Sequence, residues 1–137
     1  MNASVCLYQQ DQLLEQTMNI SQLIGKTLKS VRIIGHDEAL LFETEEGEQY
    51  EMSHQQDVYE RVYLESIIGE LEDLVGSPIL LAEEASNEVD PNTVDMICDE
   101  YCKWTFYKLA TRKGYVDLRW FGTSNGYYSV DVDFKKV

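Results

Sequence analysis

Three side chains that could do chemistry follow one another at intervals of three: His54, Asp57 and Glu60. They span a turn between two expected strands, which brings an imidazole and two carboxylates within reach of one another. An imidazole can bind a divalent metal or act as a base, and a carboxylate can fix its tautomer. Three ligands are too few to define a zinc or iron site, and the second histidine, His36, lies in a different turn. The alternative is a structural polar cluster, in which Glu60 has a partner because a buried charge requires one.

The segment 122–126, Gly-Thr-Ser-Asn-Gly, is the loop best suited to contact a ligand. Its hydroxyl and amide side chains could hold an anion or a peptide backbone, with Arg119, Tyr127 and Tyr128 at its base. A strand is expected after it, whereas phosphate-binding loops are followed by a helix. A five-residue hairpin connection explains the same residues without a ligand.

The sequence contains no pattern of a known catalytic motif, neither a Gly-x-Ser-x-Gly elbow, a phosphate loop, nor a His-Glu-x-x-His helix. Cys98 and Cys102 would lie on one face of a helix, but two further metal ligands are missing. We interpret them as ordinary thiols. We predict no catalytic residue, no metal site and no cofactor, which disfavours an enzyme without excluding one.

The formal net charge of −14 repels phosphate backbones and anionic lipids, so direct nucleic-acid binding and membrane binding are not expected. The charge suits a basic partner protein, and one version is imitation of a nucleic-acid backbone. Acidity that serves only solubility is the alternative. The candidate partner-binding acidic surface consists of Glu43, Glu45, Glu46, Glu48, Glu51, Asp131 and Asp133.

The segment 104–134 predicts three consecutive antiparallel strands, because β-branched and aromatic residues fill each run and glycine-bearing turns separate them. Val116, Leu118 and Trp120 share one face of the second run, which we expect to be core. Asp117 and Arg119 point to the opposite face, which we expect to be solvated. On the last run, Asp131 and Asp133 are expected on the solvent side with Arg119 as their cross-strand partner.

Further strands are predicted at 27–35, 39–44, 48–54, 57–64 and 79–84. Apolar residues at helical spacing predict one short helix near 66–75, with Ser66 as N-cap, Gly76 as terminator and Pro78 beyond it. The fold class is α+β, mainly an antiparallel sheet of about seven strands that forms a half-barrel or a sandwich. We expect an N-terminal arm with a short helix at 1–25 and a single β-rich domain at 26–137.

Three cysteines cannot all pair within the chain, which favours a reducing compartment. The first residues lack the pattern of a signal peptide, and no apolar run is long enough to span a bilayer. We expect a cytoplasmic protein.

Two motifs, His-x-Gln-Asp-x-x-Glu at 54–60 and Ser-Asn-Gly-Tyr-Tyr-Ser at 124–129, resemble a family of small uncharacterised bacteriophage and prophage proteins. The similarity extends over residues 26–134. Where members of this family often carry paired cysteines, the chain has Val58 and Tyr59, which argues against a metal-thiolate site. The resemblance implies a phage context and no particular reaction. Its recurring residues correspond to His54, Asp57, Glu60, Arg119, Asn125, Gly126, Tyr127 and Tyr128.

The leading hypothesis is a phage-encoded cytoplasmic binding protein that occupies a surface of a host protein. The first alternative is a small-ligand or nucleotide-binding domain with a pocket around His54 and Arg119. Its candidate ligand-binding residues, implied by their recurrence in the family that the chain resembles, are His54, Asp57, Glu60, Arg119, Asn125 and Tyr127. The second is a structural phage component. Sequence leaves the partner and the oligomeric state open.

Overall fold

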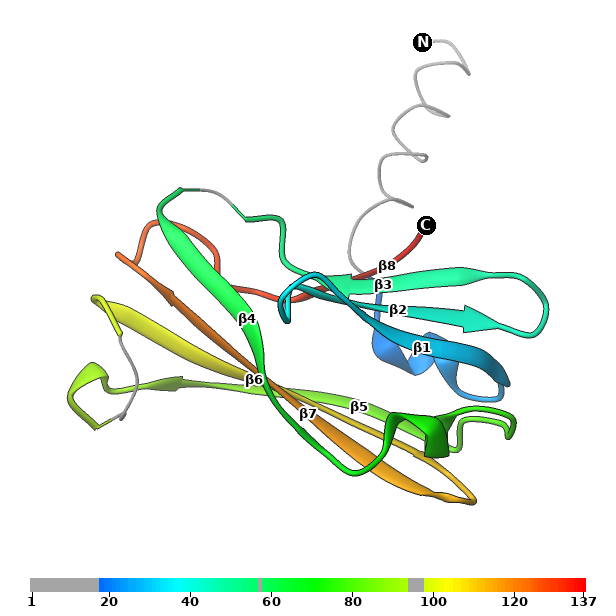
Figure 1. The fold of residues 1–137 in the computed structure, drawn as a ribbon. Coiled ribbons are helices and arrows are strands. Elements are labelled where there is room, and N and C mark those ends of the chain that lie inside the picture. Colours follow the sequence, from blue (N-terminus) through cyan, green and yellow to red (C-terminus); the bar gives the residue numbers. More distant parts are fainter. Residues whose placement is uncertain (1–17, 57, 94–97) are drawn as a thin grey trace, which may run out of the picture.

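The computed structural model describes residues 18–56, 58–93 and 98–137. Within these ranges the chain forms eight strands in two four-stranded sheets, in line with the expected number of about seven, and the strands do not close into a barrel (Figure 1). The strands are β1 (Leu28–Ile34), β2 (Ala39–Thr44), β3 (Gln49–Ser53), β4 (Glu60–Ile68), β5 (Leu81–Val89), β6 (Tyr101–Thr111), β7 (Gly114–Ser124) and β8 (Asp133–Lys136). The fold is therefore mainly antiparallel β-sheet.

The strand orders are β1-β2-β3-β8 in one sheet and β4-β7-β6-β5 in the other, with antiparallel neighbours throughout. β6 and β7 form the expected hairpin, in which Thr111 pairs with Gly114. The prediction that a third strand follows in the same sheet is wrong. β8 belongs to the other sheet, where Phe134 pairs with Met52. β7 also continues to Ser124, so the connection that follows runs over 125–132 rather than 122–126.

The core lies where the inner faces of the two sheets meet, as in a β-sandwich. Phe42 and Met52 of the first sheet belong to the same buried cluster as Leu118 and Trp120 of the second. The predicted alternation on β7 is confirmed, since Val116, Leu118 and Trp120 are all buried. Val130, Val132 and Phe134 are buried as well. The segment before β8 therefore lies against the core even though it joins no sheet before Asp133.

The helix predicted near 66–75 is not formed. β4 extends through Ile68, with Ile67 opposite Leu118, and only a 3-10 helix, η2 (Leu71–Leu74), follows. Gly69 separates the two with a φ of +101°, and a Cβ there would lie 2.5 Å from the Tyr115 carbonyl oxygen. The apolar spacing at 67–75 fits a strand end followed by one tight turn, and Glu70 provides no side-chain cap for a longer helix.

Residues 18–25 pack on the body of the protein. Asn19 accepts a hydrogen bond from the Ser21 amide and caps the 3-10 helix η1 (Ile20–Leu23), whose two apolar residues are fully buried. Ile24 bridges to Ile79, so this segment joins the stretch that leads into β5. The rest of the arm predicted at 1–25, residues 1–17, lies outside the described residues. The domain boundary at residue 25 stays a prediction.

Cys98 and Cys102 form a disulfide, so their interpretation as ordinary thiols on a helix is wrong. Cys102 lies on β6, where it is fully buried, and residues 98–100 before it are not helical. The disulfide ties the start of β6 to the segment that precedes it. In the described part of the chain, no helix has the length and apolar character needed to cross a membrane.

Candidate binding surfaces

The imidazole of His54 lies between two oxygen atoms at the edge of the core. Its Nε2 is 3.0 Å from Glu60 Oε2, and its Nδ1 is 2.7 Å from the Asp131 carbonyl oxygen. The His54 and Glu60 side chains are only 6% and 5% exposed. A carbonyl and an ionised carboxylate both accept, so both ring nitrogens donate only in the imidazolium form. These two contacts join β4 to the segment before β8 through the His54 ring.

The loop after β7 closes on itself. The Asn125 side chain accepts a hydrogen bond from the Tyr127 amide at 3.0 Å, and the Ser124 hydroxyl accepts one from the Gly126 amide at 3.0 Å. Tyr127 is 90% exposed. A cavity beside this loop, about 640 Å³ in volume, includes Glu60 and Asn125 in its lining. Two predicted ligand-binding residues thus share one hollow.

Arg119 lies apart from these residues. Ser124, which pairs with Glu60, comes five positions after Arg119 on β7, a separation of roughly 17 Å at strand spacing. Arg119 donates through Nε to Glu65 at 2.7 Å, which replaces the expected pairing with the aspartates before and in β8. Asp57 lies outside the described residues. The structure therefore brings His54 and Glu60 together, places Asn125 near them, and leaves Arg119 elsewhere.

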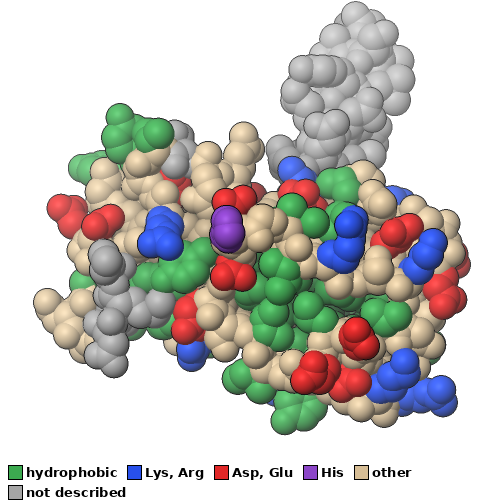
Figure 2. Space-filling model, viewed as in Figure 1, with side chains coloured by type: hydrophobic (Ala, Val, Ile, Leu, Met, Phe, Trp, Pro, Cys, Tyr) green, Lys and Arg blue, Asp and Glu red, His purple; other side chains and the backbone are tan. Residues whose placement is uncertain are grey.

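Much of the predicted acidic surface lies on the hairpin of β2 and β3, here called the acidic hairpin. Glu43 and Glu51 belong to β2 and β3, and Glu45 and Glu46 are exposed in the turn between these strands. Asp133 begins β8, the next strand in the sheet. On the face seen in Figure 2, red carboxylates alternate with blue cationic side chains rather than forming a field of one sign. The net negative charge is therefore dispersed on this face.

Two of the predicted acidic residues already form ion pairs with lysines of the same chain. Glu48 contacts Lys26 at 2.7 Å and Lys136 at 3.0 Å, and these hydrogen bonds lower its pKa to about 2. Asp131 pairs with Lys103, whose ammonium holds the pKa of Asp131 below its usual range. These carboxylates are the least available to a basic partner.

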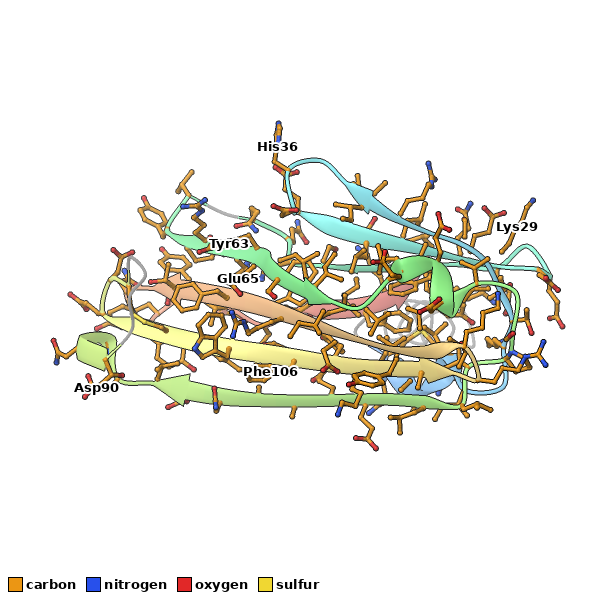
Figure 3. The ribbon with its side chains drawn as sticks, turned by 60° about the horizontal axis from the view of Figure 1, so that its bottom comes forward. Lys29, His36, Tyr63, Glu65, Asp90 and Phe106 are labelled. Atoms are coloured by element: carbon orange, nitrogen blue, oxygen red, sulfur yellow. A yellow bond between two sulfur atoms is a disulfide. The ribbon has the colours of Figure 1, made fainter. Side chains whose placement is uncertain are left out.

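The most distinctive surface is the outer face of the β4-β7-β6-β5 sheet. It carries an aromatic cluster, here called the outer aromatic cluster, which consists of Tyr63, Trp104, Phe106 and Phe121. Figure 3 shows Tyr63 and Phe106 on the side of the sheet that is turned toward the reader, together with Glu65. Phe121 is fully buried beneath its neighbours, whereas the other three rings are half-buried. The sheet is thus apolar on both faces.

Two arginines cover part of this cluster. The Arg119 guanidinium lies 4.7 Å from the centre of the Trp104 ring, and Arg61 lies 4.6 Å from the centre of the Tyr63 ring. Such stacking of a planar cation on an aromatic face is favourable. Burial raises the pKa of Tyr63. The surface offers rings, guanidinium groups and the Glu65 carboxylate side by side.

Sequence reasoning expected an exposed sheet face with aromatic and carboxylate side chains, but it did not identify these four residues, because it assigned the second face of the sheet to solvent. The available signal was the run 104–107, Trp-Thr-Phe-Tyr, in which Trp104 and Phe106 alternate with the inward Tyr107 and Thr105. A strand with large apolar residues at both parities has two covered or partly covered faces.

Among the described residues, no group of three His, Cys, Asp or Glu side chains is arranged to hold a metal ion.

A family model described as "Domain of unknown function (DUF7448)" matches residues 21–134. No curated protein and no solved structure matches the chain. The matched range contains the His54–Glu60 pair, the acidic hairpin and the outer aromatic cluster. The prediction of an uncharacterised family over most of the chain is confirmed in this form.

Proposed function

We propose that the chain, which belongs to the family described as domain of unknown function DUF7448, is a binding protein that occupies a surface of a partner protein. The contact would be made by the outer face of the β4-β7-β6-β5 sheet. The single observation that carries this proposal is the half-buried outer aromatic cluster, which lies outside the core between the two sheets.

The composition of this face supports a protein partner. Tyr, Trp, Phe and Arg are the residue types enriched at the centres of protein interfaces, where they contribute most of the binding free energy. Two further large apolar side chains on the same face are exposed, Ile68 at 60% and Tyr115 at 59%. Apolar side chains gathered on one sheet face are typical of an interaction surface.

The charge of the chain supports a basic partner. A formal net charge of −14 would speed the encounter with a positively charged surface and disfavour nucleic acids. We further propose the context suggested by the sequence motifs, a phage-encoded protein that acts on a host protein in the bacterial cytoplasm. Nucleic-acid mimicry by the predicted acidic surface has less support, because two of its carboxylates, Glu48 and Asp131, form ion pairs with lysines.

The ligand-site alternative also has less support. The residues that would form its pocket are separated, with His54 paired to Glu60 and Arg119 paired to Glu65 at another level of the sheet. The cavity beside Asn125 remains as the hollow that such a ligand would use.

The test is affinity purification of the tagged protein from host cells, with the variant Phe106→Glu. Ile34→Glu is the matched control, because Ile34 is an apolar residue 40% exposed on the other sheet. We expect a partner protein that is recovered with the native chain and the control and lost with Phe106→Glu.

Recovery of the same partner with all three proteins would contradict the proposal. A partner lost only with the double variant Glu43→Lys, Glu45→Lys would favour the acidic hairpin instead. Recovery of untagged copies of the chain alone would favour a structural component that assembles with itself.

A further inference from the structure

One row of side chains on the outer face does not pair as its register predicts. The row crosses the sheet in the order Ile68, Asp117, Lys108 and Glu83 on β4, β7, β6 and β5. Opposite charges directly across an antiparallel pair normally attract each other. Lys108 would therefore be expected to form ion pairs with Asp117 and Glu83, which lie on either side of it.

The cations near Asp117 are engaged elsewhere. The Lys108 ammonium lies 5.7 Å from the centre of the Tyr115 ring, and Arg119 is held by Glu65 and by the face of Trp104. Oδ1 of Asp117 is buried and has no hydrogen-bond partner within the described ranges. A buried carboxylate oxygen without a donor is rare in native proteins, because it loses the hydrogen bonds of water without replacement.

This carboxylate stands at a cavity of about 400 Å³ on the outer face. Ile68, Ala85 and Phe106 provide apolar walls, and Glu83 and Glu84 add carboxylates. Lys108 and Arg119 also line the cavity, but these cations are engaged by the Tyr115 ring and by Glu65 with the Trp104 ring, respectively. Ligand pockets typically combine apolar walls with a few polar groups that fix orientation. The cavity therefore suits an apolar stem that ends in a hydrogen-bond donor with positive charge.

We infer that this cavity receives a lysine side chain of the partner protein, an inference that rests on the proposed function. The methylene stem of the lysine packs between Phe106 and Ile68, and its ammonium donates to Oδ1 of Asp117. Lysine fits better than arginine, because a single unpartnered oxygen calls for a compact donor rather than a bidentate fork. The acidic net charge of the chain matches this occupant.

The test uses n-butylammonium as a probe for the lysine side chain, followed by NMR chemical shifts of the full chain. We expect saturable shifts confined to residues at the cavity, including Ala85, Phe106 and Asp117. Asp117→Asn should weaken binding at least ten-fold, whereas Glu46→Gln in the distant β2–β3 turn should leave it unchanged. n-Butanol, which has the stem without the charge, should bind more weakly by a similar factor.

Equal binding by Asp117→Asn, or shifts scattered over all carboxylates, would overturn the site. Preferential binding of n-propylguanidinium would overturn the choice of lysine. The captured partner separates this inference from the proposed function. A partner lost with Phe106→Glu but retained by Asp117→Asn overturns the lysine pocket alone. Probe binding that needs Asp117, with no partner protein lost by Phe106→Glu, overturns the partner protein and points to a free amine.

Discussion

The rings of Trp104 and Phe121 lie 4.7 Å apart on the outer face of the β4-β7-β6-β5 sheet, while Trp120, the residue before Phe121, lies in the core on the other face. Two consecutive aromatic residues thus serve opposite sides of one strand. The outer face therefore carries a packed aromatic cluster beside its charged and exposed side chains, and the proposed binding function depends on this cluster.

The outer layer should contribute to stability as well as to binding. Phe121→Ala removes a fully buried ring and should lower the free energy of unfolding by about 3 kcal/mol, the usual cost of such a cavity. Tyr115→Ala, on the same strand and face but 59% exposed, should change it by less than about 0.5 kcal/mol. Urea denaturation measures both. Equal effects would mean that the outer face is not packed in solution.

The buried contact between His54 and Glu60 should stabilise the fold. His54→Gln removes this contact from a buried carboxylate and should lower the free energy of unfolding by about 1–3 kcal/mol. The control is His36→Gln, because His36 is the other histidine and is exposed. The free energy of unfolding of the His36→Gln variant should stay within about 0.5 kcal/mol of the native value. A small effect at His54 would contradict the buried pair.

Glu48 should make stability depend on pH in the acid range. Lys26 and Lys136 lower its pKa in the folded state to about 2, below the ordinary value of 4.5. A lowered pKa gives a contribution that is present above pH 4.5 and is lost as the pH falls toward 2. Glu48→Gln should therefore be less stable than the native protein at pH 6, and the difference should shrink between pH 4.5 and 2.

Denaturation curves at several pH values measure this difference. Glu46→Gln is the control, since Glu46 is exposed in the adjacent turn and should leave the pH dependence of the native protein intact. A difference for Glu48→Gln that stays constant from pH 6 to pH 2 would contradict the two lysine contacts.

The Cys98–Cys102 disulfide can be tested by counting free thiols before and after reduction. In a Cys6→Ser background the chain keeps two cysteines, so protein purified without reductant should show no free thiol in denaturant and two after reduction. Reduction should lower the free energy of unfolding by about 2 kcal/mol, the entropy of a loop of this length. Two free thiols before reduction would contradict the disulfide.

Local patterns predicted the strands where one face alternates with the other. Tyr50 and Met52 on β3, and Val62 and Leu64 on β4, are buried as their spacing indicates. Pairing between distant strands was beyond reach, because β8 meets β3 across some eighty residues of chain and no local signal names its partner. The apolar spacing at 67–75 fitted a helix and a strand end equally well.

The candidate site was predictable in part for the same reason. His54 and Glu60 are close in sequence, and the alternation on their strands turned both toward the core. Arg119 and Glu65 are far apart in sequence, and their contact depends on the register of β4 with β7 and on a shift in that register between Leu64 and Ser66. A register of this kind is set by the whole sheet.

The most direct test of the central claim is photo-crosslinking in living cells with benzoylphenylalanine in place of Phe106, compared with the same replacement of Ile34. The account predicts one partner protein crosslinked at Phe106, with no corresponding product at Ile34. A product that forms equally at both positions, or only at Ile34, would contradict a binding surface on the outer face of the β4-β7-β6-β5 sheet.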